Sequence, residues 1–592
     1  MTSSPSWPGD GGPWPEDEED PRGDLQWGSI PGLVAYAAER YPDHEAVVDG
    51  AVRLTFSKLA ASSIQVTRAL MAAGTEPGDR VALWAPNSVG WVLTALGALG
   101  AGAVLVPLNT RFKGPEASYV LRRSGAKVLY TVRGFLGVDY PELLRGEDVP
   151  ALERIVLLGE AGGHVPEEGS VASATDEVPV FGWGEHLEGA DGIVEGPGGV
   201  VGVPVLEHDA RNRWQAVRGS DLSDLIFTSG TTGAPKGVIS THAQSLRTFG
   251  AWSQVVGLAS GDRYLVVNPF FHTFGYKAGI LACLMRGATI VPQAVFDVDS
   301  VLETVQSERI TVLPGPPTLY QSLLDHPGRA GADLSSLRLA VTGAAVVPVE
   351  LVRRMGAELD FSTVLTAYGL TESTGVVTMC RRGDPPEIIA ATSGRAIPGV
   401  EVRVVDDKGV TVPANSPGEV VVRGYTVTSG YLDDPAATAE AIDEDGWLHT
   451  GDIGVQDERG NLRITDRKKD MFIVGGFNVY PAEVEAVLRT HDAVSQVAVV
   501  GVPDERLGEV GKAYVVPRPA AGLGAGPPPA GADPEALARS LLDWAREQMA
   551  NYKVPRSVEL VEALPVNASG KVLKTELRRR ALGHASADQR GA

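Results

Sequence analysis

Hydrophobic and polar positions along the first part of the chain follow patterns typical of alternating helices and strands. The spacing of apolar residues predicts helices over 56–73 and 88–100. Short runs rich in β-branched residues predict strands over 80–84, 127–131 and 154–158. Strands that alternate with helices indicate a parallel sheet with helices on both faces.

One apolar stretch resembles a membrane span. Residues 91–108 are apolar apart from Thr94, but the stretch contains Gly97, Gly100 and Gly102 and ends in Pro-Leu-Asn. We favour a buried helix that ends at these glycines, followed by a buried strand over 103–106, because no second stretch of this kind exists. We therefore expect no integral membrane span.

The pattern changes further along the chain. Residues 159–219 are rich in Gly, Pro and acidic residues, which predicts a surface excursion or a poorly ordered connection. Alternating helices and strands resume from residue 224 to about 405, and antiparallel ribbons follow at 418–422 and 461–465. A compact α+β pattern then comprises helices over 481–489 and 534–549 and strands over 494–502, 511–516 and 557–561.

The sequence thus predicts an α/β fold with two domains. The larger domain, residues 28–467, consists of parallel or mixed sheets covered by helices, with a small β-ribbon subdomain. A small α+β lid domain follows over 468–583. Residues 1–27, rich in Pro, Gly and acidic side chains, and residues 584–592 are expected to form disordered tails.

Composition narrows the classes of function. The 592 residues include 52 Lys and Arg against 74 Asp and Glu, a formal net charge of −22. This balance argues against a nucleic-acid-binding protein, which relies on clustered cations. Two cysteines exclude a disulfide framework and a cysteine-rich zinc cluster and indicate a reducing compartment. No secretory signal is visible, so we expect a cytoplasmic protein.

The strongest local signal is a loop of glycines and hydroxyl residues that follows an apolar strand at 225–227. Its glycines let the backbone approach a ligand closely, and its N–H groups and hydroxyls are suited to cradling phosphate oxygens. The loop lacks the Walker pattern, and a flexible hairpin of small residues is the alternative. We predict phosphate contacts from Thr228, Ser229, Gly230, Thr231, Thr232, Gly233 and the mobile cation of Lys236.

This loop, Thr-Ser-Gly-Thr-Thr-Gly-Ala-Pro-Lys-Gly, resembles the signature loop of the adenylate-forming superfamily, which includes acyl-CoA synthetases, luciferases and nonribosomal-peptide adenylation domains. Four further motifs follow in the order of that family: Tyr-Gly-Leu-Thr-Glu-Ser at 368–373, Gly-Trp-Leu-His-Thr-Gly-Asp at 446–452, Asp-Arg-Lys-Lys at 466–469 with Gly-Gly-Phe-Asn at 475–478, and Asn-Ala-Ser-Gly-Lys at 567–571. The resemblance covers nearly everything from residue 30 to 580. It implies ATP, Mg²⁺ and, as a co-substrate, CoA.

The resemblance assigns roles within these motifs. It implies that Glu372 binds Mg²⁺, for which a carboxylate is a suitable hard ligand, although a helix-capping acid is the alternative from the residue alone. It implies that Asp452 and Arg467 hold the ribose. Lys571 is implied to contact the acyl carboxylate and the α-phosphate, where a cation offsets accumulating negative charge. Around the adenine base it implies Tyr368, Gly369 and Thr371, with Gly343, Ala344 and Ala345 on the other side.

Two half-reactions are implied as well. A carboxylate attacks the α-phosphate of ATP to give an acyl-adenylate and pyrophosphate, with Thr231, Glu372, His272 and Lys571 as the catalytic group. A thiol then attacks the mixed anhydride and AMP leaves. The family rotates its C-terminal domain between these steps, which implies a pivot at Lys469 and presentation of Gly475, Gly476 and Phe477 to the pantetheine.

The substrate class depends on residues 268–276, Asn-Pro-Phe-Phe-His-Thr-Phe-Gly-Tyr. Phe270, Phe271, Phe274 and Tyr276 predict an apolar binding wall. His272 matches the position that guards the acyl carboxylate in CoA ligases, although the residue alone is more often a hydrogen-bonded core histidine.

The choice of acyl group and acceptor follows from the same region. No Asp occurs between 268 and 279, which disfavours an amino-acid substrate, and no carrier-protein domain follows Lys571, which favours free CoA. Residues 268–279 and Thr-Gly-Ala-Ala at 342–345 are similar to actinobacterial acyl-CoA ligases, some of which act on propionate side chains of degraded steroid rings. We expect an acyl-CoA synthetase for an apolar carboxylic acid, either a fatty acid or such a propionate. An acyl-AMP ligase that loads a carrier protein and a catalytically silent binding protein are the alternatives.

Overall fold

The computed structural model describes residues 20–159, 178–191, 195–196, 199–200, 204–228, 235–343, 347–467, 470–474, 477–504, 507–518, 534–549, 551–566 and 572–588. The chain divides into two compact units. The first comprises Met1–Val402 and Val422–Leu448, and the second comprises Arg403–Val421 and His449–Ala592.

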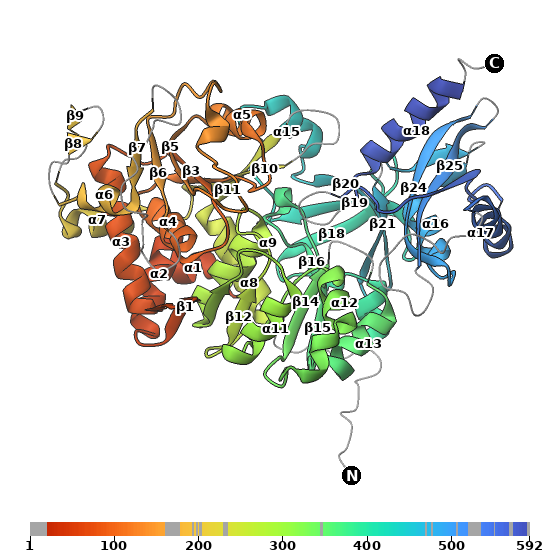
Figure 1. The fold of residues 1–592 in the computed structure, drawn as a ribbon, viewed down its shortest axis with the longest axis horizontal. Helices are drawn as coiled ribbons and strands as arrows, with labels where there is room; N and C mark the ends of the chain where they lie inside the picture. The colour runs from red at the N-terminus through yellow and green to blue at the C-terminus, as the bar shows by residue number, and fades with distance from the viewer. Residues whose placement is uncertain are drawn as a thin grey trace, which may run out of the picture. The chain divides into compact units, whose positions relative to one another are not determined.

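A seven-stranded sheet forms part of the first unit, and all of its strands except β11 run parallel (Figure 1). On one face, α5 packs into a core with Trp84, Leu129 and Ile155, while α4 packs against β3 and β4 and in turn contacts α3. This confirms the α/β class expected from the sequence. The strands in spatial order are β11 (Lys236–Thr241), β10 (Leu222–Thr228), β4 (Val104–Pro107), β3 (Arg80–Trp84), β5 (Ala126–Thr131), β6 (Arg154–Leu157) and β7 (Val180–Gly182).

The first unit also contains the two-stranded sheet of β8 (Glu195–Gly196) and β9 (Gly199–Val200), and two four-stranded sheets. Val312 forms parallel bridges with both Tyr264 and Leu339, so it links the two sheets edge to edge. One sheet has the order β12 (Arg263–Val266), β13 (Thr289–Pro292), β1 (Glu45–Asp49) and β2 (Val52–Thr55), and the other β14 (Leu339–Gly343), β15 (Thr363–Tyr368), β16 (Thr378–Met379) and β17 (Arg395–Ala396).

The helices of the first unit include one π-helical segment, η3 (Tyr276–Leu281), between two short α-helices. They are α1 (Gly23–Trp27), α2 (Ile30–Arg40), α3 (Phe56–Ala72), α4 (Val89–Gly100), α5 (Gly114–Ser124), α6 (Trp183–Glu188), α7 (Glu207–Ala216), α8 (His242–Val255), α9 (Thr273–Gly275), α10 (Ala282–Arg286), α11 (Val298–Ser307), α12 (Pro317–Asp325), α13 (Val349–Glu358), α14 (Pro386–Ala391) and α15 (Pro435–Ala441). Short 3₁₀ segments are η2 (Glu142–Leu144), η4 (Pro327–Gly331) and η5 (Thr371–Ser373).

The apolar stretch 91–108 forms a buried helix and a buried strand, as expected. Ser88 caps α4 by accepting a hydrogen bond from the Trp91 N–H, and after α4 ends the chain turns at Gly102 with φ +77°. Helix α4 lies close against α3, because a Cβ added at Gly97 would be 2.4 Å from the Val66 Cβ. Among the described residues, no helix is both long and apolar enough to cross a membrane.

The expectation of a surface excursion or poorly ordered connection over 159–219 is wrong for part of that segment. Residues 180–182 add strand β7 to the sheet, and α7 packs on α3 and α4. The buried Trp214 indole donates to Thr67 Oγ1 (2.8 Å), and Thr67 donates to the Gly97 carbonyl (2.7 Å). A Cβ added at Gly100 would lie 1.8 Å from Trp214 Nε1, so glycine is required there. Contacts with residues far away in the sequence order this segment, and the local hydrophobic pattern does not indicate such contacts.

Both predicted tails are partly ordered. From Asp20 onward the chain is held by an ion pair between Asp20 and Arg247 (2.5 Å) and by the buried Trp27 of α1. At the other end, α18 continues through residue 588, within the segment expected to be disordered from 584. At the N-terminal end, the contacts of Asp20 and Trp27 supply the order that the composition lacks.

The second unit is an α+β structure with two sheets. Strands β18 (Val400–Val405), β19 (Pro417–Gly424), β20 (Leu448–Gln456) and β21 (Leu462–Arg467) form one. The other has the order β23 (Phe477–Val479), β22 (Phe472–Val474), β25 (Gly508–Pro517) and β24 (Val494–Asp504), with β26 (Ser557–Leu560) also on β25. Helix α16 (Pro481–Leu488), α17 (Pro534–Gln548) and α18 (Lys574–Asp588) accompany them. Apolar side chains of α16 and α17 pack with β24 and β25 in a buried core.

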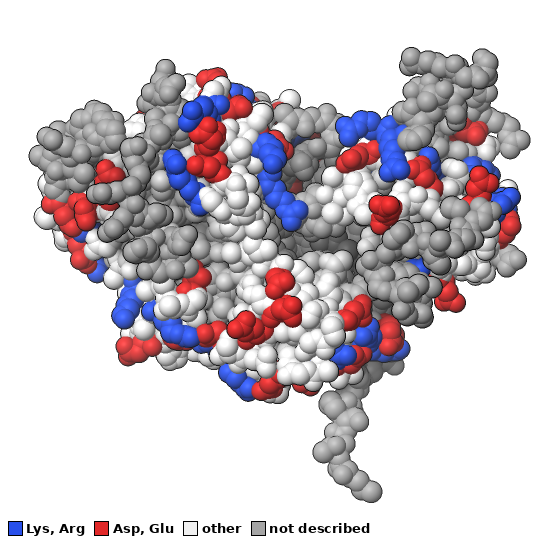
Figure 2. Space-filling model, viewed as in Figure 1, with Lys and Arg blue, Asp and Glu red and all other residues white. Residues whose placement is uncertain are grey.

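Acidic and basic side chains are interspersed on the face of the molecule drawn in Figure 2.

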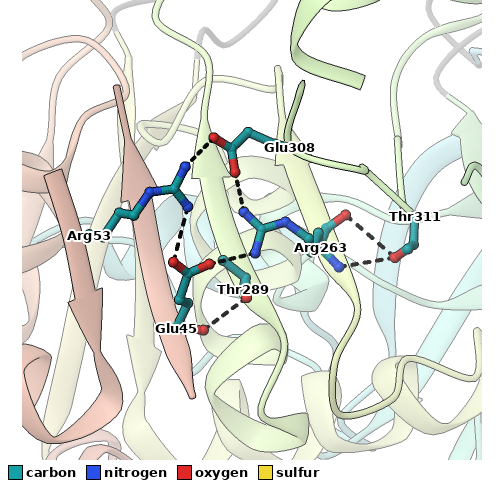
Figure 3. A network of polar contacts seen from close by, with 6 residues as sticks. All are labelled: Glu45, Arg53, Arg263, Thr289, Glu308 and Thr311. Atoms are coloured by element: carbon teal, nitrogen blue, oxygen red, sulfur yellow. Dashed lines mark hydrogen bonds and ion pairs between the residues drawn. The ribbon is translucent and has the colours of Figure 1, made fainter. Parts of the chain in front are cut away.

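One group of these charges forms a defined network, which we call the edge network: Glu45, Arg53, Arg263 and Glu308 (Figure 3). Each carboxylate binds both guanidinium groups. Glu45 lies 3.0 Å from Arg53 and 2.6 Å from Arg263, and Glu308 pairs with the same two arginines. The network joins β1, β2 and β12 to the end of α11.

Candidate active site

The predicted phosphate loop is carried by the hairpin of β10 and β11. The two strands pair with Thr228 opposite Lys236 and with Asp224 opposite Ser240. Thr228 and Lys236 therefore stand side by side at the two ends of the loop. The residues Ser229, Gly230, Thr231, Thr232 and Gly233 lie outside the described residues.

Tyr431, which no sequence motif indicated, connects Glu372 to this hairpin. The Tyr431 hydroxyl donates to Glu372 Oε1 (3.0 Å), and the Lys236 ammonium lies 5.0 Å from the centre of the Tyr431 ring. Burial, together with the Glu372 carboxylate, raises the pKa of Tyr431 above its ordinary value, so it stays a hydrogen-bond donor.

The position of Tyr431 follows from backbone pairing. Ile239 N–H donates to the Gly430 carbonyl (3.1 Å) and Leu432 N–H donates to the Gly237 carbonyl (2.8 Å), so the segment lies along β11. Thr428 N–H also donates to the backbone carbonyl of Glu372 (2.8 Å). Glu372 and Tyr431 are distant in sequence, and no local motif signals this contact.

The residues predicted around the adenine base gather at the carboxyl ends of two neighbouring parallel strands. Gly343 ends β14 opposite Ala367 of β15, and Tyr368 ends β15. A Cβ at Gly343 would be 2.6 Å from the Ala367 carbonyl oxygen, and one at Gly369 would be 2.2 Å from that of Gly375, so both positions require glycine.

This edge of a parallel sheet is where open α/β folds bind ligands. Tyr368 and Thr371 are half-buried there, close in sequence to Glu372 in η5. Ala344 and Ala345 lie outside the described residues.

The four aromatic residues predicted to form an apolar wall differ in their burial. Phe270 and Tyr276 are completely buried, and their ring centres lie 5.0 and 5.7 Å from that of Trp91 in α4, so these two side chains support the wall from the core. Phe271 and Phe274 are half-buried and remain available to a ligand. The pattern of aromatic residues alone does not separate core-facing from ligand-facing rings.

His272 caps α9, where its Nδ1 accepts a hydrogen bond from the Phe274 N–H (3.2 Å). The side chain is exposed, yet the surrounding protein desolvates the imidazole and lowers its pKa below the usual value. The bond to Nδ1 likewise requires the unprotonated nitrogen. The acyl segment also contacts the loop after β15, since a Cβ at Gly375 would lie 3.0 Å from the Thr273 Cβ.

In the second unit, the two residues predicted to hold a ribose are brought together. Asp452 of β20 and Arg467 of β21 are directly opposite in the antiparallel pair. Asp452 is buried, and its N–H donates to Thr450 Oγ1 (3.1 Å). Antiparallel pairing thus brings the backbones of these two residues together although they are fifteen positions apart in sequence.

The remaining predicted residues of the second unit are described in part or not at all. Phe477 begins β23 and pairs with Val474 of β22. Val566 and Val572 form an antiparallel bridge on either side of the 567–571 motif. Lys469, Gly475, Gly476 and Lys571 lie outside the described residues.

Two family models match this chain. The model of AMP-binding enzymes matches residues 34–432, and that of the AMP-binding enzyme C-terminal domain matches residues 483–571. The chain is 50% identical, over 93% of its length and 98% of the relative, to a 3-[(3aS,4S,7aS)-7a-methyl-1,5-dioxo-octahydro-1H-inden-4-yl]propanoyl:CoA ligase of Rhodococcus jostii. A ligase of the same name from Mycobacterium tuberculosis is 49% identical over 93% of this chain and 98% of its own.

Two solved structures are also similar to this chain over most of its length. The anthranilate CoA ligase AuaEII in complex with anthranoyl-AMP superposes with a TM-score of 0.79 at 29% identity, over 95% of this chain and 98% of that one. ATP-bound MatB from Rhodopseudomonas palustris superposes with a TM-score of 0.75 at 26% identity, over 93% of this chain and 99% of that one.

Proposed function

Because this chain belongs to the AMP-binding enzyme family, we propose that it is an AMP-forming acid–CoA ligase for the propanoate side chain of a bicyclic, steroid-derived diketone. The observation that carries this proposal is the 50% identity to the Rhodococcus ligase over 93% of this chain. The half-buried Phe271 and Phe274 fit an apolar ring system of this kind.

The first half-reaction joins the substrate carboxylate to the α-phosphorus of ATP and releases pyrophosphate. Two anions repel each other, so alignment and charge neutralisation are most of the task. The loop from Thr228 to Lys236 would hold the phosphates and Tyr368 would stack on the adenine. Asp452 and Arg467 would bind the ribose, and Lys571 would neutralise charge at the α-phosphate.

Glu372 would hold Mg²⁺. Its half-buried carboxylate offers oxygen ligands, and Tyr431 fixes one of them in place. Within the described residues, no group of three or more His, Cys, Asp or Glu surrounds a single point, so the phosphates and water would complete the coordination. When bound, the ion neutralises phosphate charge.

In the second half-reaction, the CoA thiolate attacks the acyl carbonyl, the bond to the phosphate oxygen breaks, and AMP leaves. Neutral His272 would stand beside the substrate carboxylate in the first half-reaction and beside the acyl carbonyl in the second. We propose that the C-terminal lid domain, residues 468–583, moves about Lys469 between the steps, so that Lys571 serves the first step and the 475–477 segment serves the second.

The direct test is AMP release with Mg·ATP, CoA and a panel of acids: the bicyclic propanoate, fatty acids of several lengths and aryl acids. We expect CoA-dependent AMP release with the bicyclic propanoate and little with the others. Release confined to fatty or aryl acids would overturn the substrate assignment. Acyl-adenylate formation without CoA turnover would instead indicate loading of a carrier protein.

The assignment of Lys571 and Glu372 to the first half-reaction can be tested separately. Lys571→Ala should slow adenylate formation by about 10²–10³-fold while thioester formation from supplied acyl-AMP stays close to wild type. Glu372→Gln, which keeps the side-chain shape, should impair only the ATP-dependent step. Equal loss of both half-reactions in folded Lys571→Ala protein contradicts the assignment.

A further inference from the structure

A lysine that the reaction scheme does not use is buried beneath the candidate active site. The Lys277 ammonium lies 2.9 Å from Asp224 Oδ1, and both side chains have an exposed fraction of 0%. Lys277 also donates to Ser240 Oγ (3.1 Å), and Ser223 Oγ donates to Asp224 Oδ2 (2.7 Å). We call Lys277, Asp224 and Ser240 the buried triad.

The buried triad joins the two parts that the first half-reaction must align. Asp224 and Ser240 are cross-strand partners in β10 and β11, the arms of the hairpin that carries the phosphate loop. Lys277 lies in η3, directly after Tyr276, the last residue of the acyl segment 268–276. The side chain that directly follows the acyl segment therefore binds both arms of the phosphate hairpin.

The backbone around Lys277 is also unusual. Residues 276–281 form a π-helix rather than continuing the α-helical turn that follows His272. A π-helical turn inserts an extra residue and changes the direction of the side chains after it, and such turns are frequent at functional sites.

Two titratable groups of the described residues that lie beside the pair, His242 and Tyr276, are both neutral. Burial and the nearby Lys277 lower the pKa of His242 to about 3, so this imidazole is neutral, and its Nδ1 accepts a bond from the Ile30 N–H (3.3 Å). Burial, reinforced by Asp224, raises the pKa of the Tyr276 hydroxyl, so it is neutral too. A buried ion pair rarely stabilises a fold more than apolar residues of similar volume do, whereas in some proteins it specifies one arrangement of the segments that it joins.

We propose that Lys277 is a positioning residue that sets the phosphate hairpin against the acyl segment, so that ATP and the acyl carboxylate are aligned for adenylation. This inference rests on the proposed function. It goes beyond it by assigning the efficiency of the first half-reaction to a residue that touches neither substrate. Thioester formation from acyl-AMP, which no longer needs the β- and γ-phosphates held, should depend on Lys277 much less.

The test uses the full-length protein and measures the two half-reactions separately, as ATP–pyrophosphate exchange and as CoA-dependent turnover of supplied acyl-AMP. The first variant is the double substitution Lys277→Met with Asp224→Asn, which removes both charges and leaves none buried alone. We expect kcat of exchange to fall about 10–100-fold, because misalignment of reactants by about 1 Å has such an effect. Turnover of acyl-AMP should stay within about twofold.

Ser240→Ala is the second variant, since it removes one hydrogen bond and no charge and should fold even where the double variant does not. We expect exchange to fall about threefold or more with turnover of acyl-AMP unchanged. Arg263→Met in the edge network is the matched control, because it breaks ion pairs in a different sheet from the one that contains the hairpin. It should leave the ratio of the two half-reactions at the wild-type value.

Three results would overturn the inference: exchange at the wild-type rate in both triad variants, equal loss of both half-reactions, or a change of their ratio in Arg263→Met as well. Failure of the proposed function itself looks different, because the wild-type protein would then show no exchange with any acid of the panel.

Discussion

The buried triad and the edge network are both ionic, yet they occupy opposite environments. Lys277 and Asp224 have an exposed fraction of 0%, and Lys277 is the single cationic partner of the carboxylate among the described residues. In the edge network, Arg53 is 46% exposed, and each of the two carboxylates is shared by two arginines (Figure 3).

The two regions use charged side chains for different purposes. In the edge network, water and a second partner compensate for the loss of any one group, so the network holds strands together without any single member being essential. In the buried triad, desolvation offsets most of the attraction, and removal of one group leaves the other charge without compensation. The triad therefore specifies an arrangement, while the edge network adds modest stability.

The largest predicted effect breaks the buried pair on one side only. Lys277→Met leaves the Asp224 carboxylate buried without its cation, which should lower the free energy of unfolding by about 3–5 kcal/mol. Adding Asp224→Asn should recover much of that loss. Urea unfolding followed by circular dichroism measures both, and a single variant as stable as wild type would show that the pair contributes nothing to folding.

An intermediate effect is expected for Arg263→Met. Its guanidinium is largely buried and binds both Glu45 and Glu308, but Arg53 remains to pair with each. We expect a loss of about 1–2 kcal/mol in the same unfolding experiment. A loss as large as that of Lys277→Met would remove the distinction between the two regions.

A smaller effect is predicted for Arg53→Ala, which should cost less than about 1 kcal/mol because its side chain is nearly half exposed. The loss should shrink further in about 1 M salt, where the Debye length is about 3 Å. The loss in Lys277→Met should not change with salt. Equal salt sensitivity of the two variants would contradict the assigned environments.

The smallest effect is the pH dependence of the edge network. Partial burial alone would raise the pKa of Glu45, but hydrogen bonds and charge from Arg263 and Arg53 outweigh it and hold the pKa below its ordinary value of 4.5. A carboxyl with a lowered pKa stabilises the fold above its unfolded-state pKa, and this contribution is lost as the pH falls through the folded-state value. The stability difference between wild type and Arg53→Ala should therefore vanish in acid, and a difference that grows there would refute this sign.

Much of the framework could be predicted from local pattern, because strands such as β3 and caps such as Ser88 depend on neighbouring residues. The segments that were missed depend on distant contacts instead. Strand β7 and helix α7 are ordered by a sheet edge and by Thr67, neither of which lies within the segment's own sequence.

Some residues of the candidate site could likewise be found from local sequence, whereas others depend on distant contacts. Glu372, Asp452 and Arg467 stand in recognisable motifs, although their roles stay predictions. Tyr431 carries no local signal, because pairing along β11 brings it to Glu372. Lys277 is concealed differently: an isolated lysine in an apolar helical stretch resembles a surface residue, and only the fold reveals that its charge is buried.

The contact between Gly100 and Trp214 has a consequence for the evolution of this fold. Any side chain at position 100 would occupy the space of the indole, so the two positions are expected to change together among relatives. Lineages that lose helix α7 should be free to place alanine or larger residues at position 100, whereas lineages that keep the tryptophan should retain glycine. An alignment of such sequences would then record, as covariation, when this helix was acquired.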